Sequence, residues 1–200
     1  MTVYFTSDLH FGHRNIMAHC PQRGPALNVE ADDLDGMNQR IIELHNEVVS
    51  AGDDVWILGD LSMHKKADYM RPLLQAMNGN IHVIMGNHDE RKAMKVLFED
   101  GTIQSYQQDK MLKVNRTDGT EGKAWKFWLY HYPIVSWPWM NKGVIHLHGH
   151  CHGRLQLDLG KGFDVGIDAP DITADYRPVS AQEVVEHAST IDFKAYDHHD

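Results

Sequence analysis

The chain has 200 residues, 42% of them hydrophobic, and a formal net charge of −9 at pH 7. This size and apolar content predict one domain over residues 1–200. The negative charge argues against stable DNA binding, which needs a basic surface. Two cysteines make no disulfide framework, and neither a membrane-spanning apolar run nor a signal peptide is visible, so we expect a cytoplasmic protein without membrane contact.

Strands and helices alternate in the first half of the sequence. Short runs rich in β-branched residues predict buried strands at 2–6, 54–58 and 80–85. Apolar residues at helical spacing predict helices at about 33–50, 66–77 and 90–98, whereas residues 14–30 look irregular because they contain Pro21, Gly24 and Pro25. This order predicts a parallel sheet with right-handed crossovers.

The second half of the sequence changes character. We predict strands at 102–114, 124–130, 144–148 and 163–167, a hairpin turn at Asp118-Gly119, a loop or short helix at 136–143 and a last helix at 179–188. These strands predict a second, more antiparallel sheet. The two halves together predict an α/β fold in which two sheets pack face to face with helices outside.

Polar side chains follow five of the predicted strands, at the points where the strands end. The carboxyl ends of strands are where open α/β sheets bind ligands. Two carboxylates, one amide and four imidazoles collect there, namely Asp8, His10, Asp60, Asn87, His131, His150 and His152. Each of them alone has an ordinary alternative, such as a turn cap, a core histidine or a surface pattern, but together they favour a metal site.

The types of these side chains narrow the choice of metal. Imidazole nitrogens with oxygen donors suit first-row ions such as Mn²⁺, Fe²⁺ or Zn²⁺ better than Ca²⁺ or Mg²⁺. The set is too large for one ion, and two ions roughly 3.5–4 Å apart would need one bridging carboxylate. The 15 histidines of the chain also call for a metal or proton-transfer role.

Five sequence blocks carry a resemblance to a known family. In chain order they are Asp8-x-His10, Gly59-Asp60, Gly86-Asn87-His88-Asp89, His131 and Gly149-His150-x-His152. This set resembles the five-block signature of the calcineurin-like metallophosphoesterases. The flanking residues resemble a small bacterial and bacteriophage branch of that family.

The resemblance implies a four-layer sandwich of two mixed β-sheets flanked by helices, with two divalent metal ions. Mn²⁺ is the expected metal, and Fe, Zn, Ni and Co are the alternatives. By the family pattern one ion is held by Asp8, His10, Asp60 and His152, and the other by Asp60, Asn87, His131 and His150, so that Asp60 bridges them. The implied chemistry is phosphoester hydrolysis, in which a hydroxide shared by the ions attacks phosphorus in line.

Other polar residues lie in or near the blocks. His88 is not a ligand in the family pattern, and it is our candidate for protonating the leaving group. Asp89 is expected either to orient the His88 ring or to cap the helix that follows. We assign no chemistry to Asp164 or Asp168.

Candidate substrate contacts flank two of the blocks. His13 and Arg14 either touch a substrate phosphate or lie in an exposed loop. Tyr132 and Trp137, with Trp139, either stack on a nucleobase or pack under a loop.

The predicted function is that of a phosphodiesterase on small nucleotides, with 2′,3′-cyclic nucleotides or RNA 2′,3′-cyclic phosphate ends as the expected esters. The negative net charge fits a small phosphoester rather than a long nucleic acid. The alternatives are a phosphomonoesterase or protein phosphatase, a nuclease, and a non-enzymatic scaffold. The intact ligand set argues against the scaffold.

Overall fold

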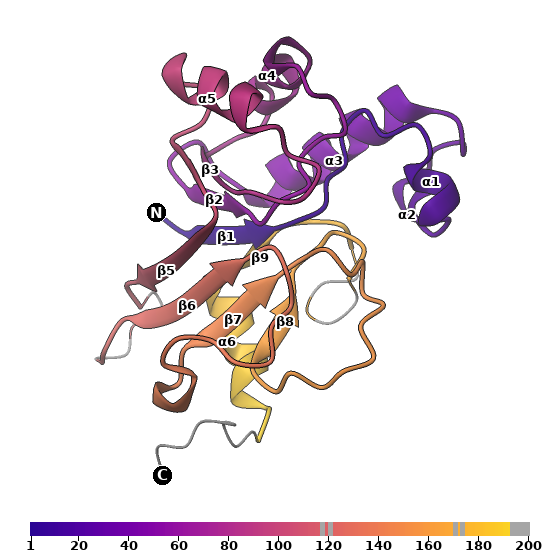
Figure 1. Cartoon of the computed structure of the whole chain (residues 1–200). Coiled ribbons are helices and arrows are strands. Elements are labelled where there is room, and N and C mark those ends of the chain that lie inside the picture. Colours follow the sequence, from indigo (N-terminus) through magenta and orange to yellow (C-terminus); the bar gives the residue numbers. More distant parts are fainter. Residues whose placement is uncertain (117–118, 120–121, 170–171, 173–174, 193–200) are drawn as a thin grey trace.

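A computed structural model of the chain describes residues 1–116, 119, 122–169, 172 and 175–192 (Figure 1). Its strands form two mixed sheets, with the orders β4-β3-β2-β1-β9 and β5-β6-β7-β8. The predicted α/β class, with two mixed sheets and flanking helices, is confirmed. Among the described residues, no helix is long and apolar enough to cross a membrane.

The first sheet is mainly parallel, as predicted from the strand–helix alternation. Its parallel strands are β1 (Val3–Thr6), β2 (Asp54–Ile57), β3 (Asn80–Ile84) and β4 (Ser105–Gln107). The short β9 (Val179–Ser180) pairs antiparallel with β1 at one edge. Figure 1 shows helices α3 (Leu34–Val48), α4 (Ala67–Gln75) and α5 (Arg91–Glu99) on the face of this sheet that is turned away from the second sheet.

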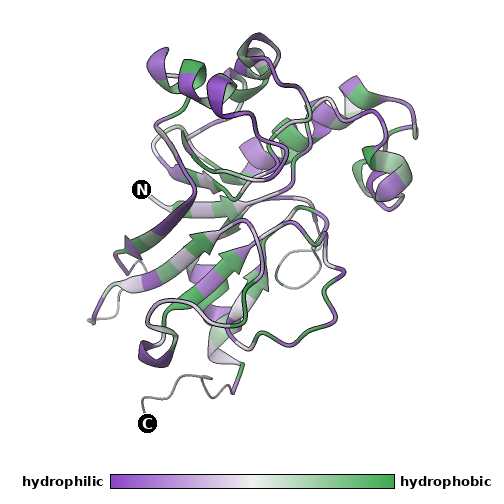
Figure 2. Cartoon of the chain, in the orientation of Figure 1, coloured by the Kyte–Doolittle hydropathy of each residue, from purple (hydrophilic) through white to green (hydrophobic). Residues whose placement is uncertain are grey.

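The helices bury one face each, because their apolar residues recur at helical spacing. In α3, Met37 and Ile41 are buried in the core cluster that the helices form with the first sheet. Asp33 caps this helix by accepting a hydrogen bond from the Gly36 N–H. Figure 2 shows hydrophobic and hydrophilic residues interspersed along the helices and the strands, as expected for elements that each bury one face.

The second sheet is also mixed. A larger share of it is antiparallel than in the first sheet, as predicted, although two of its three strand pairings are parallel. Its strands are β5 (Asp109–Val114), β6 (Trp125–Tyr130), β7 (Ile145–His148) and β8 (Gly162–Asp164). Only β5 and β6 pair antiparallel, while β6–β7 and β7–β8 are parallel. Parallel pairing needs a long crossover, usually a helix. Here residues 131–144 make it with one 3₁₀ turn, η1 (Met140–Lys142), which leaves no helical pattern to recognise.

Several other boundaries differ from the prediction. The strand predicted at 163–167 ends at Asp164, and the helix predicted at 179–188 begins at Ala181, because Val179–Ser180 form β9. The predicted strand at 102–114 is two strands in different sheets, because the chain passes from β4 in the first sheet to β5 in the second. The predicted hairpin turn joins β5 to β6, but Asp118 lies outside the described residues. Residues 14–30, predicted as irregular, contain α1 (Ile16–His19) and α2 (Arg23–Leu27). Helices this short have too few residues to show a periodic pattern.

The two sheets pack face to face through a shared apolar interior. Phe5 of the first sheet meets Phe127 of the second, with ring centroids 5.0 Å apart. The last helix, α6 (Ala181–Ser189), adds Val184 to the same cluster. Its first turn is fixed by a capping box between Ser180 and Glu183. The packed sheets hold the loops at their carboxyl ends in fixed positions.

Strand β7 contributes a buried histidine whose charge state links stability to pH. The ring nitrogens of His146 face the carbonyl oxygens of Trp128 and Tyr132 at 3.1 and 3.2 Å, and burial lowers the pKa of His146 from 6.5 to about 3. In the unfolded chain the ring takes up a proton below its ordinary pKa, but in the folded chain it does so only near the lowered value. The unfolded state therefore binds more protons, and stability falls as the pH drops through this window.

We expect acidification from about pH 7 to about pH 5 to cost the wild type about 2 kcal/mol more than a His146→Gln variant. Urea unfolding at both pH values, with a chelator present, measures the difference. An equal loss in the two proteins would show that His146 is not responsible for the acid sensitivity.

Candidate metal centre

All seven predicted ligands lie close together, in the loops that follow β1, β2, β3, β6 and β7. Two groups form there, which we call the first position (Asp8, His10 and His152) and the second position (Asp60, His131 and His150). Within each group the ligand atoms lie within 4.8 Å of one another. The rule that ligands gather at the carboxyl ends of strands therefore located these residues correctly.

The first position combines a carboxylate with two imidazoles. The Nε2 atoms of His10 and His152 are 3.3 Å apart, and each is 3.9 Å from Oδ1 of Asp8. Asp8 and His10 come from the loop after β1 in the first sheet, whereas His152 comes from the loop after β7 in the second. The first position thus spans the two sheets.

The second position also joins residues from both sheets. Nε2 of His131 lies 3.1 Å from Oδ1 of Asn87, which places the predicted amide ligand beside this group. Nδ1 of His131 lies 2.7 Å from the Leu58 carbonyl oxygen. Because a carbonyl only accepts, Nδ1 carries the proton and the Nε2 lone pair points into the site.

Asp60 connects the two positions. Its Oδ2 atom is 3.8 Å from Nε2 of His10 and 3.6 Å from Nε2 of His131. Its Oδ1 atom accepts a hydrogen bond from the His88 backbone N–H at 2.9 Å. One oxygen is therefore held by the backbone and the other faces both groups, which is the arrangement a bridging carboxylate needs.

The donor set fits divalent cations. Oδ1 of Asp8 is buried and has no hydrogen-bond partner in the part of the chain that the structure describes, and burial raises the pKa of this carboxyl to about 8. Burial lowers the pKa of His10 to about 2, which keeps its ring neutral. Buried unpaired carboxylate oxygen is unfavourable without a cation, and a bound cation reverses the shift of its pKa. Neutral imidazoles with carboxylates are the donors that first-row ions prefer.

Comparison with known proteins agrees with this geometry. A family model for calcineurin-like phosphoesterases matches residues 1–183. The chain belongs to the calcineurin-like phosphoesterase family. This family relationship confirms the resemblance that the five sequence blocks indicated, and it implies divalent metal ions at the site described above.

Relatives of this calcineurin-like phosphoesterase occur in archaea and in bacteriophages. An uncharacterised protein of Methanocaldococcus jannaschii is 32% identical over 92% of this chain and 89% of its own length. The gene 66 protein of Mycobacterium phage D29 is 29% identical over 84% of this chain and 88% of its own length. A solved structure of an Aquifex aeolicus protein of unknown function shares the fold, with a TM-score of 0.65, 20% identity and coverage of 92% of this chain and 98% of that one.

Several non-glycine residues of the candidate site have a positive φ angle, which is unusual for residues other than glycine. Five predicted ligands have left-handed backbone, with φ of 59° at Asp8, 53° at His10, 52° at Asp60, 70° at His150 and 51° at His152. Asp8 and His10 therefore do not lie on extended backbone, although their side chains approach each other to 3.9 Å. Left-handed residues cost roughly 1–3 kcal/mol each and cluster at functional sites.

Asp89 holds the loops of the site rather than the ring of His88. Its carboxylate accepts hydrogen bonds from the backbone N–H groups of Gly86 at 2.8 Å, Asp60 at 3.0 Å and Leu61 at 3.0 Å. The helix cap of α5 is Glu90, so Asp89 does not have that expected role either. Its three bonds tie the loop after β3 to the loop after β2, and thus Asn87 to Asp60.

His88 lies at the rim, where it reaches both the site and solvent. Its side chain is 39% exposed, and its Nε2 atom is 3.9 Å from Oδ2 of Asp60. Its ring centroid lies 5.6 Å from that of His10. This position suits a group that exchanges a proton with a substrate held at the site.

The candidate substrate residues divide between the site and other parts of the fold. The His13 ring lies 5.2 Å from the His10 ring, and the Tyr132 ring lies 4.8 Å from the His150 ring, so both border the site. Arg14 is exposed and lines a separate hollow with residues 31–35. Trp137 is 4% exposed and donates from Nε1 to the Val144 carbonyl, so it packs under a loop, which was the alternative expectation.

Trp139 also lies away from the site, although it is half exposed. Lys126 Nζ stands 5.6 Å from the centre of its ring. Lys126 is near the amino end of β6, whereas His131 follows the carboxyl end of that strand. Trp139 is therefore at the opposite end of the second sheet.

Sequence reasoning missed Arg23, Asp164 and Asp168. Asp164 accepts hydrogen bonds from the N–H groups of Gly153 and Gly166, and Asp168 accepts one from Nδ1 of His152. Asp164 ends β8 and Asp168 follows it, so the same strand-end pattern that marked the ligands also marked these two carboxylates. No comparable signal marked Arg23, a lone arginine in a stretch with Pro and Gly.

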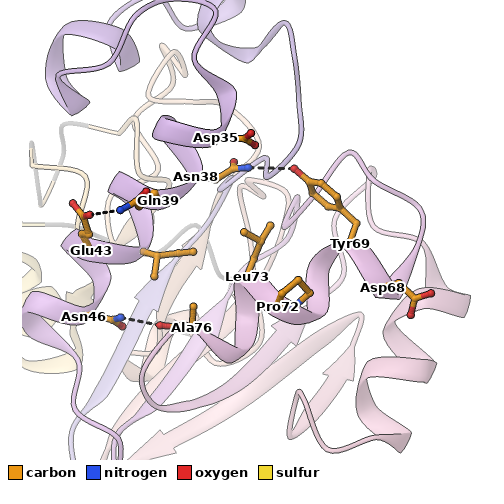
Figure 3. Close-up of a pocket in the computed structure, with 11 residues that line it drawn as sticks. Asp35, Asn38, Gln39, Glu43, Asn46, Asp68, Tyr69, Pro72, Leu73 and Ala76 are labelled. Carbon is orange, nitrogen blue, oxygen red and sulfur yellow. Dashed lines mark hydrogen bonds between the residues drawn. The ribbon is translucent and has the colours of Figure 1, made fainter.

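A pocket of about 570 Å³ lies between α3 and α4, away from this site (Figure 3). Its lining includes Leu73 and Pro72, and Asn38 donates to the Tyr69 hydroxyl across it at 3.2 Å. None of its lining residues is a predicted ligand or substrate contact. The pocket is therefore separate from the candidate site.

Proposed function

We propose that this metal-dependent phosphoesterase is a phosphodiesterase that acts on small nucleotides, with Mn²⁺ at both positions. The observation that carries the proposal is the pair of ligand groups that share Oδ2 of Asp60. When bound, two divalent ions supply a nucleophile at neutral pH and neutralise charge on the phosphoryl oxygens. The chain supplies the neutral imidazoles and carboxylates that would hold both ions.

The side chains at the rim of the site support the proposal of a diester rather than a monoester. The guanidinium of Arg23 donates to the Asp168 carboxylate and to two backbone carbonyls, so it is not placed to bind a substrate phosphate. A monoester carries nearly two negative charges at neutral pH, whereas a diester carries one. His88 and His13 at the rim are suited to hydrogen bonding with a singly charged phosphate.

A direct comparison of two aryl substrates tests the proposal. With added Mn²⁺ we expect the aryl phosphodiester to be hydrolysed faster than the matching monoester, and a panel of 2′,3′-cyclic nucleotides then ranks the natural esters. A chelator should abolish turnover and Mn²⁺ should restore it. Faster cleavage of the monoester would favour a phosphomonoesterase, and cleavage of neither would refute an esterase function.

His88→Ala is expected to lower turnover by about 10²-fold, because the leaving alkoxide loses its proton donor. Metal content should stay at the wild-type level, since the ring does not belong to either ligand group. Turnover of an ester with a very acidic leaving group should fall less, because that group needs no proton. Loss of metal in this variant would instead assign His88 a structural role.

A further inference from the structure

Arg23 is a fully buried arginine at the junction of the two loops that form the first position. It lies in α2, and its side chain has 0% exposure. Nη1 donates to the Leu9 carbonyl at 3.0 Å, and Nη2 donates to the Asp8 carbonyl at 2.6 Å. These bonds support the backbone of the segment that contains the left-handed residues Asp8 and His10. The side chains of Asp8 and His10 face the site.

The same guanidinium also holds a carboxylate from the other half of the fold. Nε and Nη2 of Arg23 donate to Asp168, at 2.9 Å to Oδ1 and 2.6 Å to Oδ2. A planar guanidinium matches a carboxylate in this two-point way, which a lysine does not. The Asp168 side chain is itself 0% exposed, so the pair excludes solvent.

Asp168 in turn orients a predicted ligand. Its Oδ2 atom lies 2.7 Å from Nδ1 of His152. The ionised carboxylate accepts a hydrogen bond from the Nδ1–H group. Nε2 is then the nitrogen that carries the lone pair, and it is directed toward Asp8 and His10. A carboxylate behind a metal-binding imidazole fixes its tautomer and ring orientation, and raises its basicity.

We propose that Arg23 and Asp168 are positioning residues that set the metal affinity of the first position and leave the second position unchanged. This inference rests on the proposed metal-dependent function. Arg23 reaches Asp8 and His10 through their backbone, and Asp168 reaches His152 through its ring. All three side chains of the first position are thus placed by one buried pair.

The selectivity follows from the different support of the second position. His131 is oriented by the Leu58 carbonyl, and Asp89 ties the loop of Asn87 to that of Asp60. The hydrogen bonds of Arg23 and Asp168 reach neither of these supports. The His150 N–H does donate to Oδ2 of Asp8, but no side chain of the second position is bonded to the pair itself. A change in the pair is therefore expected to loosen the first position and to leave the side chains of the second in place.

Mn²⁺ binding to the metal-free full chain, measured by equilibrium dialysis, tests the inference. The wild type is expected to bind two equivalents. Asp168→Asn keeps the shape of the side chain, but its amide NH₂ cannot accept the hydrogen bond from Arg23 or His152 that the carboxylate oxygen accepts. One equivalent should therefore bind about 10–100-fold more weakly. Arg23→Lys keeps the charge but loses the two-point contact, and should weaken the same equivalent by a smaller factor. The other equivalent should bind as in the wild type.

Arg71→Lys provides the matched control, because Arg71 pairs with Asp68 and Asp100 at the surface, away from both positions. It should bind both equivalents normally. Circular dichroism and thermal unfolding in chelator check that each variant is folded. Wild-type affinity for both equivalents in folded Asp168→Asn, or equal weakening of both, would overturn the inference.

The same data separate this inference from the proposed function. A wild type that binds two ions but hydrolyses no phosphoester would refute the esterase function and leave the positioning test valid. A wild type that binds no Mn²⁺, Fe²⁺ or Zn²⁺ would refute both. Added Mn²⁺ should also restore turnover of Asp168→Asn at high concentration with an unchanged KM for substrate, which a general folding defect would not produce.

Discussion

Replacing Asp60 by asparagine is expected to lower phosphoester hydrolysis by at least about 10³-fold, because this side chain serves both metal positions. Its Oδ2 atom lies within 3.8 Å of Nε2 of both His10 and His131. Asparagine keeps the shape and one oxygen but removes the negative charge. Two cations close together repel each other strongly, and the charge of the shared carboxylate offsets that repulsion.

Metal analysis and steady-state kinetics on the same sample measure the effect. Bound Mn²⁺ should fall below two equivalents in Asp60→Asn, together with kcat. Asp54→Asn is the matched control, since Asp54 begins the same strand β2 and its carboxylate accepts from Asn80, far from the ligands. A variant at position 60 with full metal content and wild-type turnover would contradict the shared role.

Gly86→Ala is expected to cost about 10³-fold in turnover and, in addition, roughly 1–3 kcal/mol of stability. A Cβ at this glycine would overlap the backbone N and the Oδ1 atom of Asp60, well inside the 3.0 Å limit of real Cβ contacts. The neighbour is backbone and a shared ligand, neither of which can move without displacing the site. Asp60 and Asn87 must then separate, so both positions lose their geometry.

Gly52→Ala is the control for this substitution, because a Cβ at Gly52 would meet nothing within 4 Å. That variant should keep the metal content, the turnover and the unfolding midpoint of the wild type. Urea unfolding and Mn²⁺-dependent hydrolysis measure both effects of Gly86→Ala. If its activity equalled that of Gly52→Ala, the close approach of the two loops would not be needed for function.

The sequence predicted the strand ends well, because a buried strand followed by Gly, Asp, Asn or His is a local pattern. The seven residues that it predicted as ligands, from Asp8 to His152, do lie close together in the structure. It did not predict the left-handed backbone at Asp60 and His150, since side chains there normally favour other conformations. The strain is maintained by contacts that are distant in sequence.

Long-range partners were also beyond sequence reasoning. Arg23 and Asp168 are 145 positions apart, and no periodicity or spacing relates them. The parallel direction of β7 was missed because residues 131–144 form a crossover with only one 3₁₀ turn. For Asp89, the sequence suggested only local roles, a contact with the His88 ring or a helix cap. Its carboxylate instead accepts hydrogen bonds from the backbone of Asp60 and Leu61, in the loop after β2, and from that of Gly86.

The span of the first position across the two sheets has a consequence for biosynthesis. Its residues are far apart in the sequence, because His10 and His152, whose Nε2 atoms lie 3.3 Å apart, are separated by 142 positions. While the ribosome is still making the second sheet, the emerging Asp8 and His10 have neither His152 nor the carboxylate behind it. Metal loading of this position is thus expected to be a late step that follows translation through His152.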